Sequence, residues 1–201
     1  MLKKEVDVLL NALDESVNSN SYWITLSINE NENQFIDDVL QHLKTGSFHF
    51  ELVKQDLTRG YNEYSEIVFP KCFENPVFIQ KPGNVWNGNE MLNIEVISKK
   101  MVEDLLMDML TGKQKYFSKS YLGTPFCNDE AKSIVHHFFK VLNDFGNWTS
   151  YNILPNFLNT IDDYYTSNHI KLGYFERCNK DLVLIFKYTH EVNILLINGS
   201  E

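Results

Sequence analysis

The chain has 201 residues, 43% of them hydrophobic and 13% aromatic, which is enough to bury the core of one large domain. Its formal net charge is -9, and the acidic balance argues against the clustered Lys/Arg surface that nucleic-acid binding usually needs. No apolar run approaches the roughly 20 residues of a membrane span, so we expect neither nucleic acid nor a membrane as a partner.

The first predicted element is an amphipathic helix over residues 3–17. Its apolar residues recur at helical spacing, and they are Val6, Leu9, Leu10, Leu13 and Val17. The alternation over Tyr22–Ile28 predicts a strand. A second amphipathic helix is expected over Phe35–Leu43, ending near Gly46.

Acidic residues occupy the stretch between Lys4 and Lys44 without a single Lys or Arg among them. They are Glu5, Asp7, Asp14, Glu15, Glu30, Glu32, Asp37 and Asp38. Because the apolar stripes of both helices must face inward, most of these acids are predicted to lie on the surface. Residues 1–110 hold 18 Asp/Glu against 9 Lys/Arg, whereas residues 111–201 hold 9 against 9. Charge of one sign attracts a basic partner, although net charge also serves solubility alone.

Short strands are predicted through the middle of the chain, at Phe48–Val53, Ile67–Phe69, Val77–Gln80 and Met91–Ile97. Trp86 lies in a loop between Gly83 and Gly88 and is a candidate contact residue. A third helix is predicted over Met101–Leu110. The segment 111–127 that follows is the one place where the sequence suggests an internal boundary.

The C-terminal part is predicted to contain two helices and a three-stranded meander. Asn128 is the expected N-cap of a helix that ends before Gly146, and a shorter helix covers Pro155–Tyr165. The strands of the meander are Lys171–Arg177, Leu182–Tyr188 and Val192–Ile197. This order of elements predicts an α+β fold, with amphipathic helices packed on small, mainly antiparallel sheets. We expect a single domain over residues 1–201, or two packed halves that divide at residue 110.

No motif for catalysis, a cofactor or a metal is evident in the sequence. His136 and His137 are neighbours on a helix and point about 100° apart, so they do not readily share one metal ion. Cys127 precedes a helix, where the N-terminal dipole can lower the pKa of a thiol. An enzyme or ligand-binding module that brings Cys127, His136 and a carboxylate together is the rival hypothesis to protein binding.

Trp148 and Tyr151 follow Gly146 and are further candidate contact residues, since Trp and Tyr are enriched in interface hot spots. The alternative is that each forms part of a lid over the core. The predicted partner-binding set, acids included, is Asp14, Glu15, Glu30, Glu32, Asp37, Asp38, Trp86, Trp148 and Tyr151.

The three cysteines, Cys72, Cys127 and Cys178, are odd in number and widely spaced, which fits reduced thiols in the cytoplasm. The acid-only stretch Glu5–Asp38 and the terminal meander Lys171–Ile197 resemble the immunity proteins that bacteria keep against polymorphic or contact-dependent toxins. This resemblance implies a non-catalytic, stoichiometric inhibitor whose acidic face docks on the basic cleft of a toxin such as a nuclease. A phage protein that occupies a host factor would use the same binding physics.

Overall fold

The computed structural model describes residues 2–28, 32–44, 51, 54–55, 58–60, 93–113, 123–154 and 182–199. The chain divides into two compact units, and each is described by itself. The first consists of Met1–Ile28, Leu92–His169 and Cys178–Glu201, and the second of Asn29–Met91 and Ile170–Arg177. The boundary suggested near residue 111 does not separate these units, because the first unit takes segments from both sides of it. No described helix is long and apolar enough to cross a membrane.

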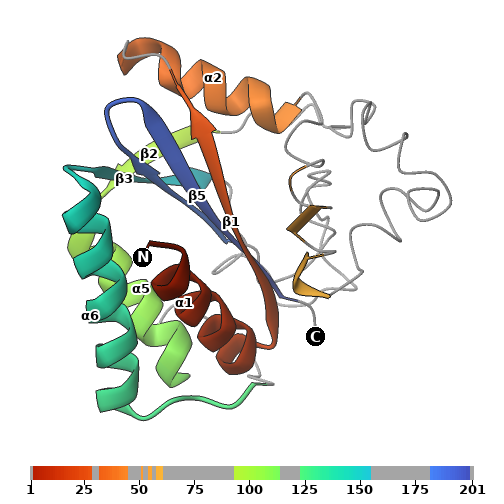
Figure 1. The fold of residues 1–201 in the computed structure, drawn as a ribbon, viewed down its shortest axis with the longest axis vertical. Helices are drawn as coiled ribbons and strands as arrows, with labels where there is room; N and C mark the ends of the chain where they lie inside the picture. Colours follow the sequence, from red (N-terminus) through yellow and green to blue (C-terminus); the bar gives the residue numbers. More distant parts are fainter. Residues whose placement is uncertain are drawn as a thin grey trace, which may run out of the picture. The chain divides into compact units, whose positions relative to one another are not determined.

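The described part of the first unit is built around a five-stranded antiparallel sheet (Figure 1). Its strands are β1 (Ser19–Ser27), β2 (Asn93–Ile97), β3 (Thr149–Leu154), β4 (Leu182–Lys187) and β5 (Glu191–Gly199). Their order across the sheet is β1-β5-β4-β3-β2, so the N-terminal strand lies beside the C-terminal one. Together with the helices, this sheet confirms the predicted α+β class.

β4 and β5 form the predicted hairpin, but the third strand beside them is β3 and not the predicted strand Lys171–Arg177. β4 and β5 pair from Leu182 opposite Ile197 to Lys187 opposite Val192, as the sequence suggested. On its other side β4 pairs with β3, which the sequence analysis did not predict as a strand. The predicted strand Lys171–Arg177 lies outside the described residues, as do Ile67–Phe69, Val77–Gln80 and the predicted helix Pro155–Tyr165. The adjacent C-terminal strands are therefore β3, β4 and β5.

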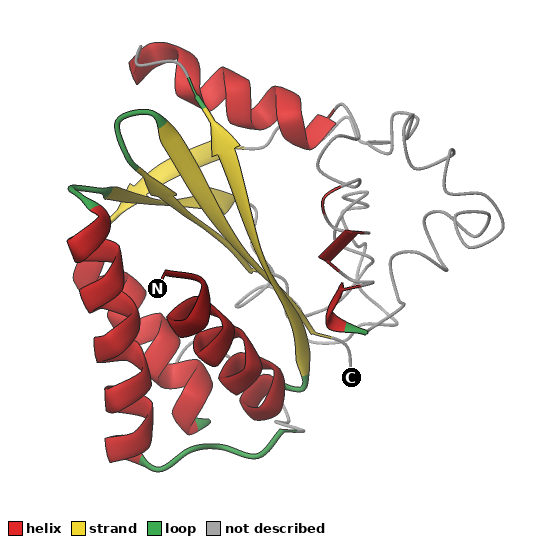
Figure 2. Ribbon diagram, in the orientation of Figure 1, coloured by secondary structure: helices red, strands yellow, loops and turns green. Residues whose placement is uncertain are grey.

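Three helices cover one face of this sheet: α1 (Leu2–Val17), α5 (Lys99–Thr111) and α6 (Asn128–Phe145) (Figure 2). Their apolar stripes meet the sheet in one core. The partly buried Trp23 ring of β1 packs against this core, 5.7 Å from the Phe138 ring of α6 and 5.4 Å from the Phe186 ring of β4. The core thus joins the first strand, a middle helix and a late strand of the chain.

The ends of α5 and α6 follow local capping rules, with one correction. The Ser98 hydroxyl oxygen accepts a hydrogen bond from the Met101 amide at 3.1 Å, and Gly112 ends α5 in the left-handed conformation, with φ 62°. The N-cap of α6 is Cys127 rather than Asn128. The Glu130 carboxylate accepts a hydrogen bond from the Cys127 amide at 3.2 Å, which is half of a capping box and places the start of the helix.

Both faces of the sheet are apolar around β4, and this explains the unbroken hydrophobic run of that strand. All residues from Leu182 to Phe186 are buried, although successive side chains of a strand point to opposite faces. Tyr22, Ile24 and Ile194 are likewise buried on the face that points away from the helices. A strand buried on both faces needs apolar residues at every position, not alternation.

The described part of the second unit contains α2 (Glu32–Lys44), which confirms the helix predicted over Phe35–Leu43. Phe35 and Val39, one turn apart, are buried, and Asp37 is exposed. The helix therefore has the amphipathic character that its sequence indicates.

Candidate partner-binding surface

Helix α1 holds the first half of the acid-only stretch and exposes its acids to different degrees. Its apolar stripe is buried at Val6, Leu9, Leu10, Leu13 and Val17. Glu15 is exposed, whereas Glu5, Asp7 and Asp14 are half-buried. The prediction that the stripe turns these acids outward is met in full by Glu15 and in part by the other three.

The last turn of α1 carries charge of the sign that its helix dipole disfavours. Asp14 and Glu15 lie at the end where the unsatisfied carbonyl groups are negative, and this turn contains no basic residue. An exposed charge of the wrong sign at such an end costs about 0.3–1 kcal/mol. The exposed Glu15 therefore gains no stability for its own helix from the helix dipole.

Residues 123–127 form a strap that joins the ends of the three helices. The Thr124 amide donates to the Glu15 carbonyl oxygen at 2.9 Å, and the Phe126 amide donates to the Leu110 carbonyl oxygen at 2.8 Å. Gly123 packs so closely on α1 that a Cβ atom there would overlap the carbonyl oxygens of Glu15 and Ser16. The strap thereby satisfies a terminal carbonyl of α1 and one of α5 before α6 begins.

This strap brings acids from opposite halves of the sequence to one end of the helical layer. Asp129 and Glu130 are exposed in the first turn of α6, and the three Cα–Cα steps from Thr124 to Cys127 span at most about 11 Å. We call the four side chains Asp14, Glu15, Asp129 and Glu130 the acidic end. The carbonyl ends of α1 and α5 add partial negative charge at the same place.

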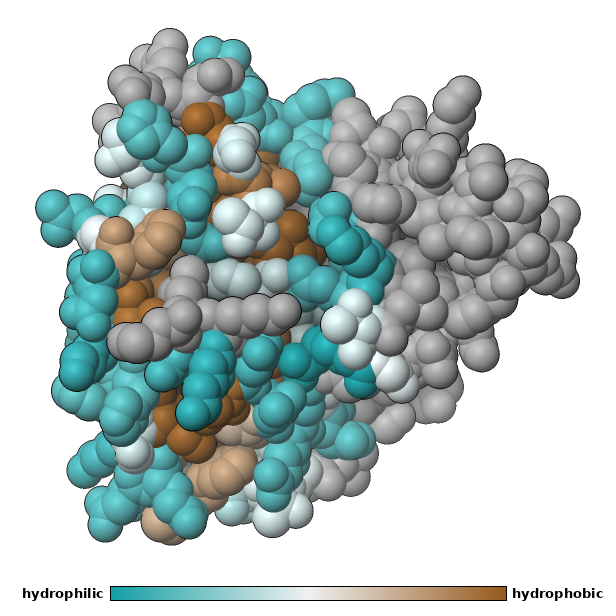
Figure 3. Space-filling view, in the orientation of Figure 1, coloured by the Kyte–Doolittle hydropathy of each residue, from teal (hydrophilic) through white to brown (hydrophobic). Residues whose placement is uncertain are grey.

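Among the described residues, two exposed lysines border the acidic end, Lys113 after α5 and Lys132 within α6. Within that part of the chain, acids therefore outnumber bases there by four to two. No ion pair among the described residues joins either lysine to Glu15 or Asp129. Figure 3 shows that hydrophilic side chains cover much of the visible surface of this layer, with apolar patches between them.

The second half of the acid-only stretch lies in the other compact unit. In α2, Asp37 is exposed and Asp38 is half-buried. Glu32 is the first residue of α2, but its side chain is outside the described residues, as are Glu30 and Trp86. The acids of α1 and those of α2 therefore belong to different compact units.

The two aromatic candidates of the first unit are part of its core. Trp148 is 5% exposed, its indole N–H donates to the Asn143 side-chain oxygen at 3.0 Å, and the Lys99 ammonium lies 3.9 Å from its ring centroid. Tyr151 in β3 is 6% exposed. These positions agree with the alternative of a lid over the core, and in this structure neither side chain offers much area to a partner.

Helix α6 keeps the candidate chemical residues apart. Cys127 stands at its N-cap and His136 in its third turn, which separates them by about 13 Å along the axis. Both are exposed, and the neighbouring His137 has its Nδ1 2.7 Å from the Ser133 carbonyl oxygen. Among the described residues, no three His, Cys, Asp or Glu side chains gather in a group that could hold a metal ion. Helix α6 alone therefore does not place Cys127 and His136 close enough to form the catalytic or ligand-binding site of the rival hypothesis.

Sequence reasoning did not assign Asp129 and Glu130 to the binding surface. It explained them as partners of the N-terminal dipole of their helix, a role that their positions fit. Their proximity to Glu15 depends on the strap, and no local pattern signals that contact. Comparison of the chain with protein-family models, curated proteins and solved structures finds no match.

Proposed function

We propose that this protein is a non-catalytic inhibitor of the immunity-protein kind, which acts in the cytoplasm by binding a basic toxin, such as a nuclease. One observation carries the proposal. The exposed acids Glu15 and Asp37 come from a stretch without Lys or Arg, and among the described residues neither forms an ion pair. Because no described cation neutralises these two carboxylates, their negative charge supports the proposal that they meet a basic partner.

Acidic charge that no described cation pairs with is well suited to speed association. A surface of one sign steers an oppositely charged protein during diffusional encounter, and this effect weakens as salt screens the field. At the acidic end, the carbonyl termini of α1 and α5 reinforce the carboxylate of Glu15, whereas the N-terminus of α6 partly offsets the carboxylate of Asp129. We expect the complex to form fast at low ionic strength and more slowly as salt is added.

Lasting affinity also needs apolar contact, because exposed charges alone contribute little to a bound complex. Trp148 and Tyr151 are buried, so the proposal does not use them as anchors. Val8 is 46% exposed and lies seven residues before Glu15, which places both on the same side of α1. An apolar side chain about two turns from Glu15 on the same side of α1 supports a mixed contact on this helix.

The first test asks whether a toxic partner exists. The tagged protein is used to capture partners from its source cells, these are identified by mass spectrometry, and the gene adjacent to its own is expressed with and without it. We expect a basic protein to co-purify and to be the toxic product of that adjacent gene. A harmless adjacent gene together with capture of a cellular housekeeping protein would replace the immunity role with occupation of a host factor.

The second test measures the part that charge plays in binding the captured protein. Replacing Asp37 and Asp38 together by Lys, or Glu15 and Asp129 together by Lys, should lower the association rate at low salt by about tenfold or more. Because the two pairs lie in different compact units, the more sensitive pair identifies the unit that meets the partner.

A matched control for this test replaces Glu103 and Asp104 together by Lys, which makes the same change of net charge in α5 at two carboxylates that already have a partner in Lys100. It should slow association less than either of the other two double variants. An association rate that neither of those two variants changes at low salt would remove the acidic stretch from the mechanism.

A further inference from the structure

We draw no further inference here: the strongest candidate, the edge of β2 that no described strand pairs with and that exposes Glu95 and Val96, carries nothing, because nothing in the described part of the chain shows what would cover it.

Discussion

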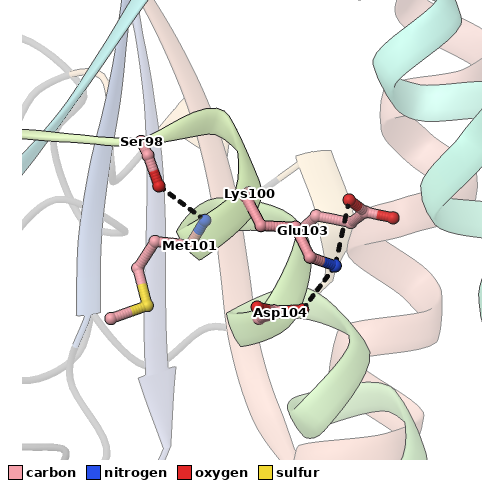
Figure 4. A network of polar contacts seen from close by, with 5 residues as sticks. All are labelled: Ser98, Lys100, Met101, Glu103 and Asp104. Atoms are coloured by element: carbon pink, nitrogen blue, oxygen red, sulfur yellow. Dashed lines mark hydrogen bonds and ion pairs between the residues drawn. The ribbon is translucent and has the colours of Figure 1, made fainter.

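Helices α1 and α5 belong to the same layer, and each carries charges that its own dipole disfavours. In α5 these are Lys99 and Lys100 at the positive N-terminal end, and in α1 they are Asp14 and Glu15 at the negative C-terminal end. The two helix ends differ in whether neighbouring side chains compensate these unfavourable charges. Lys99 lies over the Trp148 ring, and Lys100 contacts Asp104 at 2.8 Å and Glu103 at 3.5 Å (Figure 4). Glu15 has no such partner among the described residues.

The difference separates charges that neighbouring side chains compensate from a charge, that of Glu15, that no described side chain pairs with. The hydrogen bond from Lys100 to Asp104 raises the pKa of the ammonium group, so the pair favours the charged lysine. Glu103 and Asp104, one turn along α5, thus compensate the unfavourable positive charge of Lys100 at the N-terminal end of the helix. In α1 the sequence supplies no base after Lys4 that could do the same for Glu15. An unfavourable interaction with the helix dipole that no neighbouring side chain compensates is typical of residues retained for function.

The largest effect is expected where the strap meets α1. Gly123→Ala would place a Cβ atom on the carbonyl oxygens of Glu15 and Ser16, which are backbone atoms and cannot move without disturbing the helix end. Such overpacking costs about 1–3 kcal/mol, measured as a loss of unfolding free energy in urea. Hydrogen exchange should show a greater loss of protection in α1 than in α5, since Gly123 contacts α1.

The matched control for this variant is Thr124→Ala. The Thr124 side chain is exposed and its backbone amide still bonds Glu15, so we expect a change within about 0.5 kcal/mol. Equal stability of the two variants would show that the strap does not hold the end of α1, and the acidic end would lose its fixed geometry.

A smaller effect is expected at the end of α6, which resembles α1 in lacking a basic residue in its last turn. There a neutral donor takes the place of a cation, as the Tyr188 hydroxyl donates to the Leu142 carbonyl oxygen at 3.0 Å. Tyr188→Phe should lower the unfolding free energy by about 0.5–1.5 kcal/mol at neutral pH. Glu15→Gln, by contrast, should not lower it.

The pH dependence of the Tyr188→Phe effect provides a separate check. Burial, and then the nearby Glu191 carboxylate, raise the pKa of Tyr188 above its ordinary 10.0. A group with a raised pKa in the folded state stabilises the fold below its unfolded pKa and loses that contribution as pH rises above it. The parent protein should therefore lose stability relative to Tyr188→Phe above about pH 10. A stability difference that stays constant through this range would mean that the hydroxyl is not held in the core.

The smallest effect tests the comparison of α1 and α5 directly, by removing an unfavourable charge from each helix. Glu15→Gln should raise the unfolding free energy by about 0.3–1 kcal/mol at low salt, because it relieves the negative end of α1. Lys100→Gln should not raise it, since this change also removes the contacts with Glu103 and Asp104. Urea midpoints at low and high salt would measure both variants, and salt should shrink the difference between them. If both variants gained stability equally, the contacts of Lys100 would not compensate its unfavourable charge, and the two helix ends would be equivalent.

The helices could be predicted from the sequence, but β3 could not. Residues such as Val6 and Leu13 mark the buried side of α1 by spacing alone. In β3, Ser150 faces the helices and is buried. Its polar hydroxyl can be buried there because it donates a hydrogen bond to the Ile97 carbonyl oxygen at 2.8 Å. Ser150 and Asn152 alternate with Tyr151 and Ile153, which is compatible with a strand, but this run is short and its polar residues lie on the face that the helices cover. The hydrogen-bond partner of Ser150, Ile97, is 53 positions away, so no short window of sequence shows why Ser150 can be buried there.

By itself, the sequence determined that one stretch carries only negative charge and that amphipathic helices display part of it, because both properties depend on spacing within a few turns. Only the tertiary structure decided which acids lie near one another. The bond from Thr124 to Glu15 and the close contact of Gly123 with Ser16 join residues more than a hundred positions apart. These contacts bring the end of α1 to the start of α6, and they fix the acidic end by packing and backbone hydrogen bonding rather than by any local pattern.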